Sequence, residues 1–309
     1  MRPSASLRRR IKAGFEAAVV HSGIAGRFRG RLRARGLILA YHGIVPAGER
    51  PVGERSLHLR ESDFQNQLDL LIELTTVVSL DDLLTGAPAD EPRPRIAITW
   101  DDAYLGALTV GIDAVVRRGL PATVFVAPGC LGGRSFWWDR LAERAGGEMP
   151  AAVRERALRE LAGSDERIAA ALEAGDRGAA LPDFVRSADE TVLARALGRP
   201  GITVASHSWS HPSLAALGPD ALAQELGRSR DWLAERFPSR LPFLAYPYGH
   251  HSPSVLAAAE DAGYLAGFRI AGGWMDREVG NRYLLPRLNV PSGLSIDGFV
   301  LRLSGLLCR

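Results

Sequence analysis

Two pairs of polar side chains in this chain have the types and spacing that metal-assisted chemistry requires. Asp101 and Asp102 directly follow one apolar run, and His207 and His211 follow another. Two imidazoles and one carboxylate are a common ligand set for Zn²⁺, and a second carboxylate beside them can act as a general base. The combination indicates hydrolysis in which a bound ion activates water.

A third polar segment, Tyr246–Gly249, follows another apolar run and reads as a tight turn. Such a turn can aim a backbone N–H, here that of Tyr248, at a developing oxyanion. Taken alone, the segment is equally well explained as a simple turn. His250 and His251 come directly after it, and we expect both to be exposed loop residues.

Each of these groups also has a simpler interpretation. Asp101 and Asp102 precede a helical pattern, so they could cap a helix. Pro212 directly after His211 favours a rigid loop over a helix interior, which supports the metal-site interpretation. His42, at the end of an apolar run, is either a core histidine bonded to a carbonyl or a general acid. The residues alone do not decide this last point.

The elements that must position these groups follow the α/β pattern, in which short apolar runs alternate with helical stretches. Expected strands are residues 37–44, 76–80, 96–100, 122–127, 203–206, 243–246, 266–270 and 285–290. Expected helices are residues 62–74, with Ser62 as the N-cap, 105–118, 220–237 and 254–262, and residues 88–94 should form a loop. This order favours a parallel barrel or an open parallel sheet, whose strand carboxyl ends carry catalytic groups.

Residues 137–199 differ from the rest because strand-like apolar runs are absent there and Ala, Arg, Glu and Leu dominate. We therefore expect a helical insertion between strands. The chain has 309 residues, of which 46% are hydrophobic and 24% charged, a composition typical of a soluble globular protein. Its two cysteines cannot form a disulfide framework, and no apolar run is long enough for a transmembrane helix.

Basic charge is concentrated in an N-terminal arm. Residues 1–35 carry ten Lys or Arg side chains against one acidic residue, Glu16, so a basic nucleic-acid-binding body is not expected. The arm lacks the uninterrupted apolar core of a signal peptide. Apolar residues recur every four positions in the arm: Leu7, Ile11, Phe15 and Val19. This repeat suits either a helix on an anionic membrane surface or a solvated helix docked on the domain.

Read together, the three polar segments resemble the polysaccharide deacetylase family, also called the NodB-homology family or carbohydrate esterase family 4. Thr99–Ala103 resembles its T-F-D-D-G motif, His207–Pro212 its H-S-x-x-H-P motif, and Ala245–Gly249 its R-x-P-Y-G motif. The likeness spans about residues 37–291. It implies a distorted (β/α) barrel, here with a helical insertion, and removal of N-acetyl groups from an amino sugar with release of acetate.

The resemblance also implies roles for individual residues. Asp101 would be the general base, and Asp102, His207 and His211 would bind a divalent metal, with Zn²⁺ the first expectation and Co²⁺ or Ni²⁺ as alternatives. The backbone N–H of Tyr248 would bind the oxyanion. A basic arm over residues 1–36 and a catalytic domain over residues 37–309 would make up the chain.

The chain departs from the family pattern at three places. Ala103 replaces the motif glycine, and Ala245 stands where the family often has an arginine that steadies the catalytic aspartate, a task open to Arg287. The usual late L-x-H motif is missing, because no histidine follows His251. A subset resembling poly-N-acetylglucosamine deacetylases carries its acid histidine on an early strand, which favours His42 as the general acid.

The expected substrate is an N-acetylated polysaccharide or a lipid-linked amino sugar, with no nucleic acid as partner. The alternative is a metal-binding but inactive glycan-binding or scaffold protein, made credible by the missing motifs. The expected location is the cytoplasm, with peripheral contact at the inner membrane face through the basic arm. Aromatic rings commonly stack on sugars, although core packing is the more common role of a single tryptophan. Five residues are therefore candidate groove walls or core residues: Trp100, Trp137, Trp138, Trp209 and Trp274.

Overall fold

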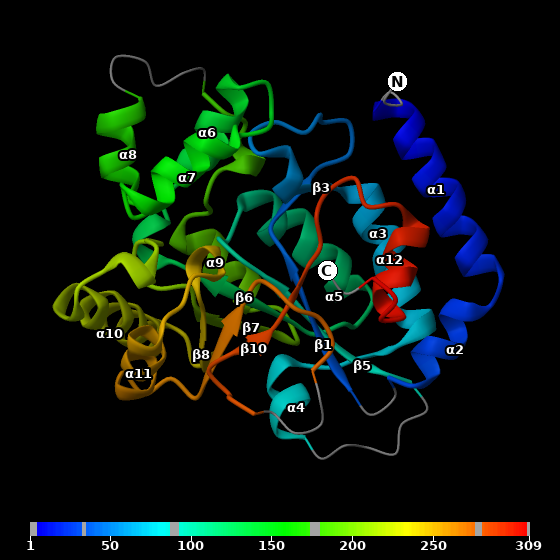
Figure 1. Ribbon diagram of the computed structural model, residues 1–309. Helices are drawn as coiled ribbons and strands as arrows, with labels where there is room; N and C mark the ends of the chain where they lie inside the picture. Colours follow the sequence, from blue (N-terminus) through cyan, green and yellow to red (C-terminus); the bar gives the residue numbers. More distant parts are fainter. Residues whose placement is uncertain (1–4, 33–34, 87–92, 174–179, 276–279, 308–309) are drawn as a thin grey trace.

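A parallel sheet, nearly closed into a barrel and surrounded by helices, forms the body of the protein (Figure 1). The computed structural model describes residues 5–32, 35–86, 93–173, 180–275 and 280–307. The strands run in the order β10-β9-β8-β7-β6-β5-β1-β11, with β4 paired to β5. Their bounds are Gly36–Tyr41 (β1), Thr76–Val77 (β4), Arg95–Trp100 (β5), Ala122–Val126 (β6), Ile202–Ser206 (β7), Arg240–Ala245 (β8), Ala266–Arg269 (β9), Leu285–Pro286 (β10) and Leu288–Asn289 (β11). The predicted barrel is confirmed.

The two edges of the sheet are joined by one short segment. Strand β10 pairs with β9 through Leu285, while β11 pairs with β1 through Leu288 and Asn289. Only Arg287 separates these two strands in the chain. The segment therefore spans the seam of the barrel and places Arg287 between the first and last long strands.

Alternation along the strands separates two apolar clusters. In β5, Ile96 and Ile98 point outward into the cluster beneath the helices, whereas Ala97 points into the barrel. The interior is filled by small residues and by aromatic rings such as Phe125 and Phe268. A packed interior leaves the carboxyl mouth of the barrel as the place where polar side chains can gather.

Helices cover the outside of the barrel (Figure 1). Their bounds are Glu61–Leu74 (α3), Leu80–Thr85 (α4), Ile112–Arg117 (α5, preceded by a π-helical turn at Ala107–Gly111), Glu190–Leu197 (α9), Pro219–Arg236 (α10), Pro253–Asp261 (α11) and Ile296–Leu303 (α12). The helices predicted at 62–74, 105–118, 220–237 and 254–262 are confirmed.

Several boundary predictions are wrong. Ser62 does not cap α3, because the helix already begins at Glu61 with Arg60 at the N-cap. The strand predicted over 76–80 stops at Val77, and Ser79 instead caps α4 by accepting a hydrogen bond from the Asp82 N–H. Most of the loop predicted at 88–94 lies outside the described residues.

The strand predicted over residues 37–44 divides at His42. Strand β1 ends at Tyr41, and Gly43–Val45 (β2) leaves the barrel to pair with His58–Arg60 (β3), which the sequence pattern did not indicate. His42 thus lies at the point where the chain turns out of the barrel mouth.

The predicted insertion is helical, as expected, but its last helix belongs to the barrel. Helices α6 (Trp137–Arg144), α7 (Ala151–Arg159) and α8 (Asp165–Leu172) stand together at the upper left of Figure 1. Helix α9 instead packs against β7 as an ordinary barrel helix. Residues 174–179 of the insertion lie outside the described part of the chain.

The N-terminal helices α1 (Ala5–His21) and α2 (Ile24–Gly30) are docked on α12 (Figure 1). Glu16 is buried and accepts a hydrogen bond from the Ser295 hydroxyl at 2.6 Å, while Val19 packs against the apolar contact between α2 and α12. Within the described residues, no helix is long and apolar enough to cross a membrane. The boundary between arm and catalytic domain at residue 36 stays a prediction.

Candidate active site

Strand alternation brings three of the predicted site residues to the mouth of the barrel. Asp101 is the next inward position after Ala97 and Thr99 on β5. His207 follows the inward Ala205 of β7, and His42 occupies the matching position beyond β1. Asp101 and His207 are buried, and only about a tenth of the His42 side chain is exposed. The three side chains therefore meet above the packed barrel interior.

Asp102, His207 and His211 converge as the sequence predicts. The His211 Nε2 lies 3.2 Å from the Asp102 Oδ1 and 3.2 Å from the His207 Nε2. The His207 Nε2 is 3.7 Å from the same Asp102 oxygen. Among the described residues this is the one group of acidic, His and Cys side chains with ligand atoms all within 4.8 Å of one another.

The chemical state of this cluster suits a divalent cation. The His207 Nδ1 lies 2.8 Å from the Ala245 carbonyl, to which it must donate, so a neutral ring turns its Nε2 lone pair toward the cluster. Burial lowers the pKa of His207 to about 4, which keeps the ring neutral near pH 7. Within the described part of the chain, the buried Asp102 Oδ1 makes no hydrogen bond of acceptable geometry, and its near neighbours are the Nε2 atoms of His207 and His211. Lone pairs and a carboxylate oxygen thus face one point, as a metal site requires.

Strained backbone is concentrated around this cluster. Five of the six non-glycine residues with positive φ in the described chain lie at or beside the site: Asp102, Ala103, Ser208, His211 and Tyr248. Such conformations cost on the order of 1–3 kcal/mol each and are typical of functional sites. Ala103 has φ 53°, which explains why the related motif carries glycine at this position.

The task left open for Arg287 is now clear from its geometry. Its Nη1 and Nη2 donate to the two carboxylate oxygens of Asp101 at 2.6 and 2.8 Å, and its side chain is completely buried. Burial alone would raise the pKa of Asp101, but Arg287, His207 and His42 outweigh burial and hold that pKa well below its usual range. Asp101 is therefore an oriented carboxylate, although Ala245 supplies no arginine.

His42 faces the same carboxylate from the other side. Its Nε2 lies 3.9 Å from the Asp101 Oδ2. Burial lowers the pKa of His42, while Asp101 and Asp102 oppose that change. The interpretation of His42 as a core histidine bonded to a carbonyl is weakened, because the ring adjoins the Asp101 carboxylate and lines a cavity with it.

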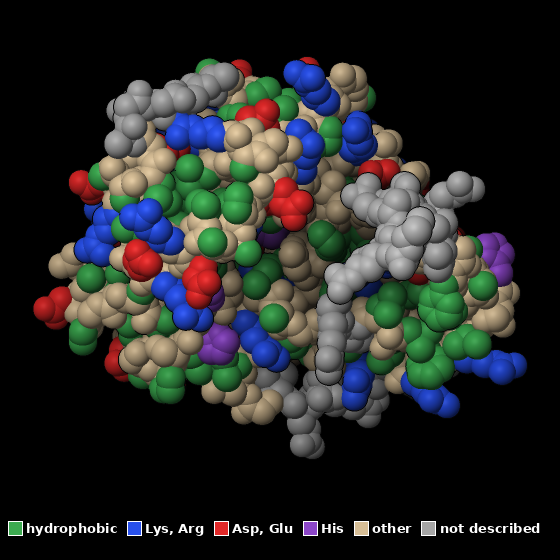
Figure 2. All heavy atoms as spheres, turned by 45° about the horizontal axis from the view of Figure 1, so that its top comes forward, with side chains coloured by type: hydrophobic (Ala, Val, Ile, Leu, Met, Phe, Trp, Pro, Cys, Tyr) green, Lys and Arg blue, Asp and Glu red, His purple; other side chains and the backbone are tan. Residues whose placement is uncertain are grey.

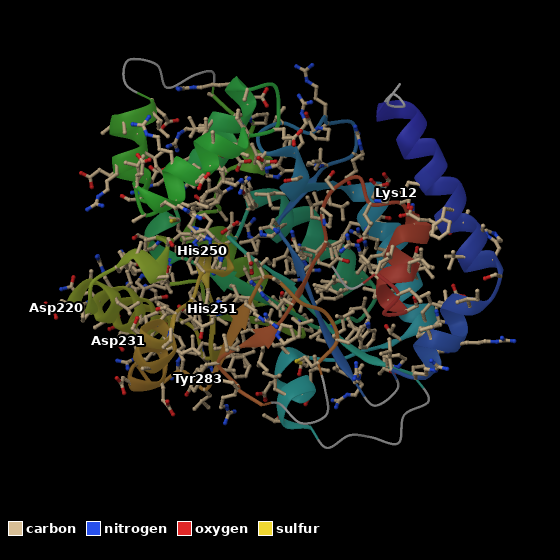
Figure 3. All side chains as sticks on the ribbon, in the orientation of Figure 1. Lys12, Asp220, Asp231, His250, His251 and Tyr283 are labelled. Atoms are coloured by element: carbon tan, nitrogen blue, oxygen red, sulfur yellow. The ribbon has the colours of Figure 1, made fainter. Side chains whose placement is uncertain are left out.

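Tyr248 has a structural role that the sequence did not reveal. Its hydroxyl accepts a hydrogen bond from the Trp137 Nε1 at 3.0 Å and lies 3.2 Å from the His211 carbonyl, to which it can donate. The ring therefore ties the insertion to the loop that carries His211. The predicted oxyanion contact of the Tyr248 N–H stays a prediction. His250 and His251 are exposed, as expected (Figure 3).

Two hollows meet at the wall formed by Trp138 and His211. A cavity of about 300 Å³ contains all the predicted catalytic and metal-binding side chains, and a groove of about 680 Å³ lies on the far side of the wall. Three of the five tryptophan candidates line the groove: Trp137, Trp138 and Trp209. A groove-wall position is wrong for the other two: Trp100 is core, packed on Phe64, and Trp274 is half-buried with its N–H directed at the Arg302 carbonyl of α12.

A buried polar network holds Trp138 in this wall. The Trp138 Nε1 donates to the Tyr104 hydroxyl at 2.7 Å, and that hydroxyl donates to the Asp139 carboxylate at 2.7 Å. The other Asp139 oxygen lies 2.7 Å from the His58 Nε2, and both of these side chains are fully buried. The Trp138 ring lies 5.0 Å from the His211 ring, so the network also confines a metal-ligand candidate.

Two further residues line the cavity that holds the candidate site, and no motif in the sequence indicates either of them. Asn289, in β11, has a buried Oδ1 with no hydrogen-bond partner among the described residues. Arg154 reaches the cavity from α7 and pairs with Glu54 at 3.1 Å. Asn289 and Arg154 reach the cavity only because segments far apart in the sequence fold toward the mouth of the barrel, which the local spacing of residues does not show.

The sequence model of the polysaccharide deacetylase family matches residues 89–267, more than half of the chain. The chain belongs to the polysaccharide deacetylase family. It is therefore a hydrolase of the class that cleaves the C–N bond of N-acetyl groups. A search of curated protein sequences found no significant match.

Solved structures share the fold at low sequence identity. The deacetylase PplD of Streptococcus pyogenes is 17% identical, with a TM-score of 0.60 and coverage of 87% of this chain and 98% of that one. IcaB from Ammonifex degensii is 16% identical, with a TM-score of 0.60 and coverage of 88% and 96%. The BpsB deacetylase domain of Bordetella bronchiseptica is 14% identical, with a TM-score of 0.56 and coverage of 84% and 97%.

Arg287→Lys should lower the kcat of acetate release by roughly tenfold or more, because a point charge cannot hold both oxygens of Asp101. KM and metal stoichiometry should change little, since neither the cavity lining nor the metal-ligand candidates are altered. Arg199→Lys, at the half-exposed pair with Asp113 (2.7 Å), is the matched control and should behave as the parent protein. Equal kinetics for the two variants would contradict a positioning role for Arg287.

Tyr104→Phe should lower the free energy of unfolding by about 1–3 kcal/mol, because it leaves the Trp138 N–H buried without an acceptor. Urea denaturation measures the change. Tyr283→Phe is the control, since it removes a partly buried hydroxyl that donates to the Tyr264 carbonyl at 2.9 Å, away from the site. A loss no larger than that of the control would show that the network contributes little.

Proposed function

We propose that the protein is a metal-dependent deacetylase that removes N-acetyl groups from an amino-sugar-containing polysaccharide or glycolipid precursor. One observation carries the proposal: a buried carboxylate oriented by Arg287 lies beside the Asp102, His207 and His211 cluster in one cavity. Membership in the polysaccharide deacetylase family supports the reaction class. Zn²⁺ is the metal we propose, because the ligand set is two imidazoles and one carboxylate.

Asp102, His207 and His211 would hold the metal. When bound, such an ion supplies Lewis-acid polarisation and makes a coordinated water more acidic. Asp101 acts as the general base and takes one proton from the attacking water. Arg287 keeps both oxygens of Asp101 in place throughout, so no reorganisation of the buried base is needed.

His42 is the proposed general acid. An amide nitrogen is a poor leaving group as an anion, so the departing amine needs a proton as the C–N bond breaks. The His42 Nε2 is 3.9 Å from the Asp101 Oδ2, which places acid and base at the same mouth. The Tyr248 N–H is the proposed donor to the oxyanion. The products are acetate and the free amine of the sugar.

The cavities suggest how a glycan is held. The catalytic cavity, about 300 Å³, is at the small end of ligand pockets and suits one acetamido sugar. The adjoining groove, with Trp209 in its wall, offers room for the rest of the substrate. The inactive-scaffold alternative is weakened because Arg287 pairs with Asp101 and His42 lies beside it, so an oriented carboxylate and a candidate acid are both present despite the missing motifs. The predicted cytoplasmic location stays a prediction.

Purified protein should release acetate from N-acetylglucosamine oligomers, lose that activity when metal is stripped, and regain it with Zn²⁺ or Co²⁺. Asp102→Ala should abolish stoichiometric metal binding, measured by elemental analysis, as well as activity. Asp220→Ala, at an exposed residue of α10, is the control. Retained metal in Asp102→Ala would exclude this cluster as the site, and full turnover after stripping would exclude metal dependence.

Asn289→Ala should raise KM for the glycan about tenfold with a smaller change in kcat, because the free Asn289 oxygen is placed to accept a substrate N–H or O–H. Steady-state kinetics with one oligomer measure both constants. Asn281→Ala, at an exposed turn, serves as control. An unchanged KM would remove Asn289 from the substrate-binding residues.

A further inference from the structure

Exposed large apolar side chains are concentrated on the helical layer at the N-terminal side of the molecule. On α1 and α2, Phe15 is 68% exposed, Ile24 42% and Phe28 38%. Ile296, the first residue of α12, is 38% exposed, and Leu307, in the segment that follows this helix, is 40% exposed. These five are most of the exposed large hydrophobic residues in the described chain, the others being Ile72 and Leu265. Single exposed apolar residues are ordinary, but a gathering of this kind marks an interaction surface.

The exposure of Phe15 is built into the way α1 is docked. The neighbouring Glu16 is buried, accepts from the Ser295 hydroxyl at 2.6 Å and pairs with Lys12 at 3.7 Å. Val19 packs against the apolar contact with α12 on the same side of the helix. Turning α1 to bury the Phe15 ring would remove Glu16 from its buried partner. The helix is therefore held with a polar residue inward and a phenyl ring outward.

Exposed basic side chains flank this apolar surface. Arg27 lies on α2, Arg31 is the C-cap of that helix, and the exposed Lys12 of α1 pairs with the buried Glu16 at 3.7 Å. The acidic residue in the first turn of α12 is the partly buried Asp297. The Arg31 guanidinium lies over the Phe28 ring at 5.1 Å. Figure 2 shows hydrophobic side chains gathered at its right-hand edge with Lys or Arg side chains beside them.

We propose that α1, α2, the start of α12 and the segment after it form a membrane-binding surface that seats the protein on an anionic lipid bilayer. Apolar rings flanked by arginines match the chemistry of such a surface, where the rings enter the headgroup boundary and the cations meet anionic headgroups. Lys12 on α1 and His250 at the catalytic cavity lie well apart (Figure 3), so the seated protein keeps its cavity open. This surface is independent of the proposed deacetylation.

The test is sedimentation of the full chain with vesicles of phosphatidylcholine alone and of phosphatidylcholine with about one-third phosphatidylglycerol. We expect roughly tenfold or stronger binding to the anionic vesicles, weakened by high salt because the charges are screened. Phe15→Ser with Phe28→Ser should lower the binding about tenfold. Leu265→Ser, which replaces a side chain 50% exposed in the turn before β9, should leave it unchanged.

Arg27→Glu with Arg31→Glu is a second variant that leaves the apolar residues intact, and it should also lose anionic binding. Thermal unfolding of each variant shows that the fold is retained. Acetate release from soluble oligomers should be unchanged in both double variants. Absence of release from the parent protein would count against the proposed function alone and would leave the membrane proposal to the sedimentation result. Equal binding to neutral and anionic vesicles, no binding to either, or vesicle-independent self-association through Phe15 and Phe28 would each overturn the proposal.

Discussion

The buried ion pair between Arg287 and Asp101 is the interaction on which the active site depends. A buried carboxylate without a partner takes up a proton, and a buried guanidinium without one is strongly destabilising, so each charge makes the other possible. Arg287 lies between β10, which pairs with β9, and β11, which pairs with β1. The ion pair can therefore form only when this segment closes the barrel. Closure of the barrel and orientation of the proposed base, Asp101, therefore occur together.

The helical insertion is tied to the same mouth by two polar links. Trp137 donates to the Tyr248 hydroxyl, and Trp138 is fixed through Tyr104 to a buried Asp139. Both tryptophans belong to α6, the first helix of the insertion. Barrel residues thus hold the wall between the candidate-site cavity and the large groove. These contacts also keep the loop that carries His211 in its strained conformation.

Local patterns were sufficient to predict parallel strands with polar groups at their carboxyl ends, whereas the choice of a barrel over an open sheet came from the family resemblance. Alternation along β5 and β7 leads directly to Asp101 and His207, because each is the next inward position after its strand. The same alternation points Trp100 outward, so the strand pattern predicts a core position beneath the helices for this residue and not a groove wall. The Asp139 network and the free oxygen of Asn289 were not predictable, since their partners and cavities come from segments far apart in sequence.

The most direct test is a double-mutant cycle with Asp101→Asn, Arg287→Met and the variant that carries both substitutions. The free energy of unfolding of each protein is measured by urea denaturation in the presence of a chelator. Each single variant leaves one buried charged or polar group without its partner and should lose about 3–5 kcal/mol. The double variant should be more stable than Arg287→Met or Asp101→Asn alone, because no unpaired charge remains. Losses that simply add in the double variant would contradict the central role of this ion pair.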